Sequence, residues 1–118
     1  MGMFKKAIDS TVPDTKRIFY FTPASSAEKL DLNDYPYYTE IHCDTTSYTG
    51  VVTLPNVREA MGMEYTVRIH AGGTNAITVQ DRDDSEGWTD ITIEDADDRV
   101  TVRSNGVSWS LVESYEAD

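Results

Sequence analysis

From residue 50 onward the chain reads as short segments that alternate apolar and polar side chains and are separated by turn-forming residues. In segment 64–70, Tyr65, Val67 and Ile69 fall on one face and the residues between them on the other, which is the period of two that a half-buried strand requires. Segments 50–54, 76–80, 88–95, 100–104 and 107–113 show the same β-rich character. This pattern restricts the chain to an all-β fold.

Two turns suggest hairpins. Residues 71–75 (AGGTN) offer positive-φ positions between strands 64–70 and 76–80, so we expect these strands to pair. Asn105-Gly106 lies between VTVRS and VSWSLVE and is the pair that two-residue type I′ turns prefer. In that second hairpin one face is expected to be buried in the core, and its residues are Val100, Val102, Trp109 and Leu111.

The segment PNVREAMG predicts one short helix near residues 56–61. Asn56 can cap it, Glu59 follows three residues later as in a capping box, and Gly62 suits a left-handed stop. Before residue 50 the pattern is weaker. RIFYF and YTEIHC are strand candidates, whereas ASSAEKLDLND is typical of a loop or a turn of helix. The cluster formed by three tyrosines can belong to the core, to its rim or to an interface; its members are Tyr35, Tyr37 and Tyr38.

Together these segments predict about eight strands, most simply arranged as a small antiparallel sandwich or jelly roll. A chain of 118 residues has room for one core, so we expect a single β domain over 18–118, preceded by an extended N-terminal arm over 1–17. No internal repeat long enough for a solenoid is evident in the sequence.

The net charge of the chain limits the classes of partner that we expect it to bind. A net charge of −11 argues against binding to nucleic acid or to an anionic membrane surface, and no apolar run is long enough to cross a membrane. No apolar stretch follows Lys5 and Lys6, so a secretory signal is not expected and synthesis in a cytoplasm is the default. Residues 1–17 carry a net charge of +2, which is typical of an arm that lies on another chain or of a disordered leader. The candidate partner-binding residues are Phe4, Lys5, Lys6, Lys16 and Arg17.

Residues 81–98 hold nine acids, a density that could bind calcium. The segment departs from the EF-hand loop, because Glu86 occupies the glycine position and Thr92 the position of the bidentate acid. A solvated acidic loop is the favoured interpretation, and calcium binding stays open. We expect no metal, no cofactor and no catalytic residue.

Three further side chains bear on chemistry. Cys43 has the pattern of a buried strand residue, and its neighbour His42 should point to the opposite face, away from its sulfur. His70 is likewise expected to face outward. We therefore predict that the protein is not an enzyme. Paired acids for glycoside hydrolysis stay open, since sequence does not give distances.

We expect the two tryptophans to differ in burial and in role. Trp109 alternates with core positions and should be buried. Trp88 follows Gly87 at the edge of the acidic loop, where it can close the loop onto the sheet or contact a ligand.

Residues 51 to about 112 resemble a module of tailed-bacteriophage virion proteins, found in tail fibres, tail spikes, head fibres and capsid decoration proteins. The order of elements carries the resemblance: a VTLP strand exit, a capped turn ending in glycine, YTVR, a double-glycine turn, ITV, ITI and an SNG-x-x-W hairpin. The loop DRDDSEG is more acidic than the module leads one to expect, and residues 1–49 lie outside the resemblance.

The resemblance implies a structural virion protein, usually a homotrimer without catalytic residues. Because the chain is small, the resemblance favours a capsid decoration, or cement, protein. Such a protein is assembled in the host cytoplasm and bound to the major capsid protein outside the head shell, with the N-terminal arm as a clamp. The alternative is a receptor-binding or tip module of a head or tail fibre or spike, which recognises a surface glycan with Trp88 as the ligand contact.

Overall fold

The computed structural model describes residues 17–72, 75–83 and 88–116. Within these residues the chain forms nine β-strands and one short 3₁₀ helix, η1 (Leu32–Asp34), so the predicted all-β class is confirmed. The strands are β1 (Ile18–Phe21), β2 (Glu28–Asp31), β3 (Glu40–Asp44), β4 (Gly50–Leu54), β5 (Glu64–Ala71), β6 (Ile77–Asp81), β7 (Ile91–Ile93), β8 (Arg99–Ser104) and β9 (Trp109–Tyr115).

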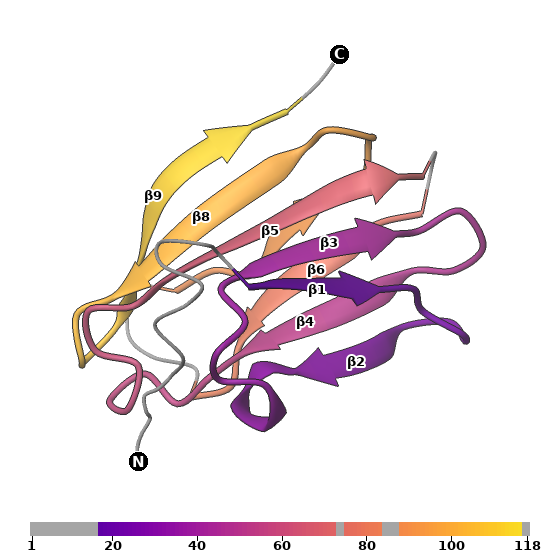
Figure 1. The fold of residues 1–118 in the computed structure, drawn as a ribbon. Helices are drawn as coiled ribbons and strands as arrows, with labels where there is room; N and C mark the ends of the chain where they lie inside the picture. Colours follow the sequence, from indigo (N-terminus) through magenta and orange to yellow (C-terminus); the bar gives the residue numbers. More distant parts are fainter. Residues whose placement is uncertain (1–16, 73–74, 84–87, 117–118) are drawn as a thin grey trace.

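The strands form two mixed sheets, a five-stranded sheet in the order β1-β3-β5-β8-β9 and a four-stranded sheet in the order β2-β4-β6-β7. From β1 to β6 the chain alternates between the sheets, and strands that are neighbours within a sheet run parallel. These six strands form three successive coils, each with one strand in either sheet (Figure 1). The last three strands pair antiparallel and extend both sheets.

This topology corrects the predicted antiparallel order. The pairs made by β1 to β6 are parallel, and β5 and β6, predicted to be hairpin partners, lie in different sheets. Both strands bury alternate side chains completely, Val67 and Ile69 in β5 and Ile77 and Val79 in β6. Alternation is the same for a strand that turns back beside its neighbour and for one that crosses to the facing sheet, so sequence could not separate the two.

The hairpin at Asn105-Gly106 is confirmed, because β8 and β9 pair antiparallel. Its turn is longer than predicted. The Asn105 amide donates to the Ser108 carbonyl, and the Asn105 side chain accepts from the amides of Val107 and Ser108, both at 2.8 Å. Trp109 is buried as expected, but Leu111 is 55% exposed because β9 is the edge strand of its sheet.

The predicted helix near 56–61 is wrong: the segment makes turns only. Asn56 does cap it, since its Oδ1 accepts from the amides of Arg58 and Glu59 at 3.1 Å, and Gly62 has the expected positive φ of 85°. The chain stops after that turn because it must enter β5 at Glu64. Segment 24–34, predicted as a loop or a turn of helix, instead contains β2 and η1.

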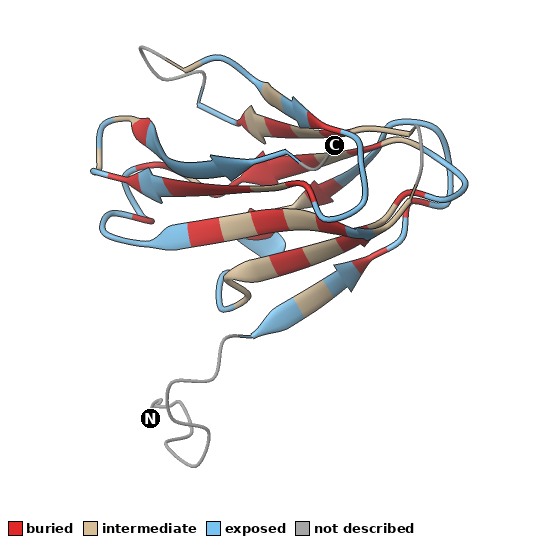
Figure 2. Cartoon of the chain, turned by 90° about the horizontal axis from the view of Figure 1, so that it is seen from above, coloured by how far each residue is buried: buried red, intermediate tan, exposed pale blue. Residues whose placement is uncertain are grey.

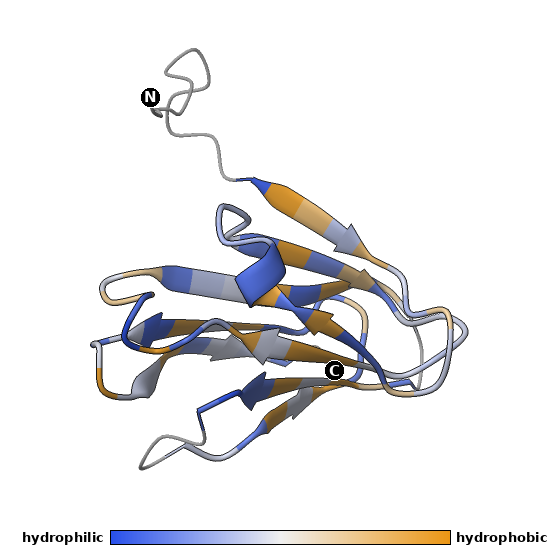
Figure 3. Ribbon diagram, turned by 90° about the horizontal axis from the view of Figure 1, so that it is seen from below, coloured by the Kyte–Doolittle hydropathy of each residue, from blue (hydrophilic) through white to orange (hydrophobic). Residues whose placement is uncertain are grey.

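One hydrophobic core is shared by both sheets. Buried and partly buried residues alternate along β3, β5 and β6, so that each strand has a core face (Figure 2). Hydropathy alternates along the strands in the same way (Figure 3). The largest fully buried side chains come from both sheets and from η1; they include Leu32, Ile41, Val52, Leu54, Val67, Ile77 and Ile93. In the described residues no helix is long and apolar enough to span a membrane.

Candidate functional site

Of the predicted arm residues, Phe4, Lys5, Lys6 and Lys16 lie outside the described part of the chain. Arg17 is described, at the start of β1. Its carbonyl oxygen accepts from the amides of Thr39 and Glu40, at 3.2 Å each. The first described strand, β1, therefore lies at the edge of the five-stranded sheet as described, beside the segment that leads into β3.

Trp88 is half-buried and packs against the core. Its indole Nε1 donates to Asp90 Oδ1 at 2.9 Å. With its N–H bonded to Asp90 and its ring packed against the core, the side chain holds the segment just before β7 onto the body. Its predicted role as a ligand contact stays a prediction.

The acidic loop is only partly solvated. Asp81 and Asp98 are buried, at 5% and 3% exposure. Asp98 Oδ2 accepts from the amides of Glu94 and Asp95, at 3.3 and 3.0 Å, and Asp97 forms an ion pair with Arg68. Over the ranges that the structure describes, no group of three or more His, Cys, Asp or Glu side chains is placed to hold a metal ion. These carboxylates shape loops instead.

Cys43 is fully buried, as predicted, and burial raises the pKa of its thiol to about 12. His42 lies on the opposite face of β3, as expected, and its Nε2 is 3.1 Å from Glu40 Oε2. The strand register brings His42 beside His70 and Tyr20, with ring centroids 5.5 to 6.2 Å apart. Sequence reasoning missed this outer cluster because neither the parallel pairing nor the register was predictable.

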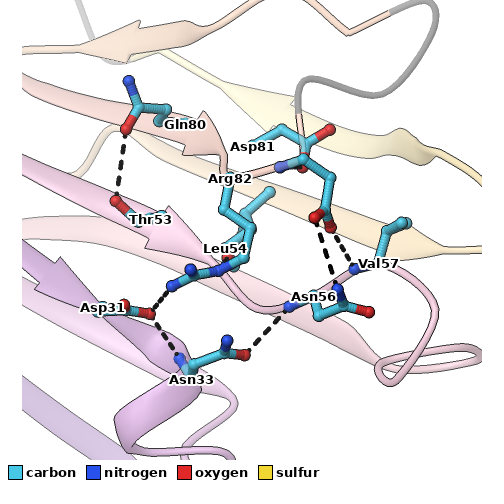
Figure 4. A network of polar contacts seen from close by, with 10 residues as sticks. Asp31, Asn33, Thr53, Leu54, Asn56, Val57, Gln80, Asp81 and Arg82 are labelled. Carbon is cyan, nitrogen blue, oxygen red and sulfur yellow. Dashed lines mark hydrogen bonds and ion pairs between the residues drawn. The ribbon is translucent and has the colours of Figure 1, made fainter.

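A polar network ties together the chain where β2, β4 and β6 end (Figure 4). Arg82 donates from Nε to the Leu54 carbonyl at 3.2 Å and from Nη2 to Asp31 Oδ1. Asp31 in turn accepts from the Asn33 amide at 2.9 Å. The Arg82 guanidinium holds the pKa of the Asp31 carboxyl below its ordinary value.

The network continues into the turn after β4. Asn33 Oδ1 accepts from the Asn56 amide at 3.1 Å. Asp83 Oδ2 accepts from the Val57 amide at 2.8 Å, and its Oδ1 is 3.5 Å from Asn56 Nδ2. One end of all three coils is therefore held by side chains that bond to one another and to backbone groups of the neighbouring coils.

Beside this network lies an open groove of about 420 Å³ between the β2–β3 and β4–β5 connections. Its wall is mostly apolar, with a few polar groups at the rim. The lining residues are Asn33, Pro36, Tyr37, Pro55, Glu59, Ala60, Met63 and Tyr65. We call this the tyrosine groove.

The three tyrosines predicted to form a cluster occupy two different environments. Tyr35 and Tyr38 pack on Phe19, with ring centroids 4.5 and 5.4 Å from it, and so belong to the rim of the core. Tyr37 turns into the groove and is 68% exposed. Sequence could not single out Tyr37, because its groove partners come from another coil.

Compared with known proteins, the chain matches no protein-family model and no curated protein.

Proposed function

We propose that this protein is a capsid decoration protein of a tailed bacteriophage, which binds the outside of the head shell as a homotrimer and stabilises it. The sequence resemblance over 51 to about 112 supports the virion class. In this proposal the two mixed sheets form a small sandwich-like body, the partner is the major capsid protein, and the protein carries no cofactor and catalyses no reaction. Burial raises the pKa of the Cys43 thiol to about 12, which argues against this residue as a nucleophile and bears on no other side chain.

The observation that carries the proposal is where the chain enters the body. Arg17 leads directly into β1, which among the described strands pairs with β3 alone and so lies at the edge of its sheet. Two of its side chains are exposed, Ile18 at 37% and Tyr20 at 64%. An open edge strand is a template for another chain. An arm that leaves from such an edge can bind a neighbouring surface together with it.

Charge and symmetry support the same function. Residues 1–17 have a net charge of +2 on a chain of −11, so arm and body favour different surfaces. In a trimer, once one arm is bound, the other two bind at a high effective concentration. Weak individual contacts then add up to a stable clamp on the shell.

The test is co-sedimentation with shells that lack the protein. A full-length variant with Lys5→Glu, Lys6→Glu and Lys16→Glu should lose binding, whereas Lys29→Glu, an exposed substitution in β2, should bind like the wild type. Unchanged circular dichroism shows that the body is intact. Equal binding by the arm variant and the wild type would refute the clamp. The copy number in purified particles, measured by quantitative mass spectrometry, checks the decoration role: a few copies indicate a fibre instead.

The alternative, a receptor-binding or tip module, requires an open ligand surface. Trp88 is half-buried and its N–H is already donated. The tyrosine groove is open, and this observation keeps the alternative as a second candidate.

A further inference from the structure

We propose that the tyrosine groove binds a neutral saccharide, with one pyranose ring stacked on Tyr37 and its hydroxyl groups bonded to Asn33, Glu59 and Tyr65. This site is separate from shell attachment through the arm. It gives the second candidate function a ligand class and a location, and rests on that candidate only for its biological role.

The aromatic platform is the first argument. Tyr37 is 68% exposed, and within the described residues its ring packs against no other aromatic ring, in contrast to Tyr35 and Tyr38. Below it the wall is apolar, formed by Pro55, Ala60 and Met63. A pyranose presents one face of C–H groups and a rim of hydroxyls, so it matches an apolar wall with polar groups at the edge.

The unpartnered polar groups are the second argument, and Tyr65 is the strongest of them. Its side chain is 98% buried, since the residue is 2% exposed, and it lines the groove. Its hydroxyl makes no hydrogen bond within the described residues. Nor does this oxygen belong to the fully enclosed atoms that lack a partner, which are Thr45 Oγ1, Arg68 Nε and Trp109 Nε1. The hydroxyl therefore reaches solvent. Because Tyr65 lines the groove, we infer that the hydroxyl does so there, where a ligand hydroxyl can satisfy it.

Asn33 and Glu59 supply complementary partners. Asn33 Oδ1 is held by the Asn56 amide, which fixes the side chain while its Nδ2 donors stay unbonded within the described residues. The Glu59 backbone is held by the Asn56 cap, and its carboxylate makes no ion pair or hydrogen bond in the same part of the chain. An amide donor, a carboxylate acceptor and a phenol that does both can satisfy adjacent sugar hydroxyls.

The charge of the groove lining and the extent of its aromatic surface favour one class of ligand. Among the described residues, Glu59 is the only charged one that lines the groove, and no lysine or arginine does, so sialic acids and phosphorylated sugars are repelled. A proline-rich peptide needs a row of aromatic slots along about 12 Å for four residues of polyproline II helix. Here Tyr65 is buried, and Tyr37 alone offers an exposed aromatic face. The groove therefore fits a compact neutral ring better than an extended peptide.

The experiment is an amide NMR titration of the full chain with methyl glycosides of glucose, galactose and mannose and with N-acetylglucosamine. At least one should shift the amides of Asn33, Tyr37, Ala60 and Met63, with a Kd on the order of millimolar, as expected for a single small ring. N-acetylneuraminic acid should shift none of them.

Two variants and one control test whether Tyr37 and Tyr65 contact the sugar. Tyr37→Ala should weaken binding about tenfold and Tyr65→Phe about fivefold, because they remove the platform and one hydrogen bond. Tyr48→Ala removes another exposed tyrosine, 43% exposed and outside the groove lining, and should bind like the wild type. Unchanged spectra away from the groove establish that each variant is folded.

The proposal is overturned if none of the sugars shifts the groove amides, if Tyr37→Ala binds as tightly as the wild type, or if a proline-rich peptide occupies the groove and no sugar does. Shell binding separates the two functions: the lysine variant of the arm should keep sugar binding, and Tyr37→Ala should keep shell binding. Failure of one proposal is then distinguishable from failure of the other.

Discussion

The Asp31–Arg82 ion pair is expected to stabilise the fold by a measurable amount, because it joins the ends of two coils rather than two neighbours on one strand. Both side chains are partly exposed, at 40% for Asp31 and 26% for Arg82, so solvent screens their attraction. We expect a coupling energy of about 0.5–1 kcal/mol between them. Arg82→Met should lower the free energy of unfolding by about 1 kcal/mol beyond this coupling energy, since it also removes the donor to the Leu54 carbonyl.

The assay is a double-mutant cycle of Asp31→Asn and Arg82→Met, measured by urea unfolding with tryptophan fluorescence. Its matched control is Arg103 with Glu64, an ion pair at 4.0 Å whose side chains are 58% and 49% exposed. That pair should give a coupling of about 0.2 kcal/mol or less.

The coupling should also depend on pH in a defined direction. The folded pKa of Asp31 is depressed below its ordinary value of 3.8, so the stabilisation is fully present above pH 3.8 and is lost as the pH falls through the lower, folded pKa. The other carboxyl groups of the chain, which has 21 Asp and Glu residues, also make stability depend on pH. The wild type, the two single variants and the double variant share that dependence, so it cancels in the coupling energy. Equal couplings in the two cycles, or an Asp31–Arg82 coupling that does not weaken as the pH falls below 3.8, would contradict this prediction.

Three further outcomes are expected. Gly50→Ala should lower the free energy of unfolding by about 1–3 kcal/mol, measured in urea, because its new Cβ would lie 2.7 Å from Pro23 Cγ; a neutral result would contradict the close packing of these coils. Cys43 should not react with a thiol reagent at about pH 8 in the native protein and should react fully in denaturant; rapid native labelling would mean that the core opens. Asn56→Ala should cost about 1 kcal/mol in thermal unfolding, since it leaves the amides of Arg58 and Glu59 uncapped; an unchanged Tm would show that water replaces the cap.

Local alternation predicted most strands but not their arrangement. β5, β6 and the β8–β9 hairpin follow from period-two segments and from Asn105-Gly106. The coils do not, because a period of two identifies the buried face of a strand without naming the sheet it joins. β2 (Glu28–Asp31) was missed since it buries Leu30 fully and leaves Glu28 and Lys29 exposed, a pattern too short to distinguish from a loop.

The three coils also leave no repeat in the sequence. In the five-stranded sheet Ile18 pairs with Glu40 and Glu40 with Thr66, so equivalent positions are separated by 22 and then by 26 residues. Unequal turns and unlike side chains at paired positions remove the fixed period that identifies a solenoid. The polar network and the tyrosine groove depend on this register, and so neither could be predicted.

The coils place the network and the groove at the same end of the molecule, and Asn33 belongs to both. Its amide donates to Asp31 and its Oδ1 accepts from the Asn56 amide, so the network fixes the side chain whose Nδ2 is proposed to bind the ligand. A residue whose backbone and side chain are each held by one hydrogen bond loses little conformational entropy when a ligand binds. The same contacts that hold the coil ends together therefore pre-organise the rim of the groove.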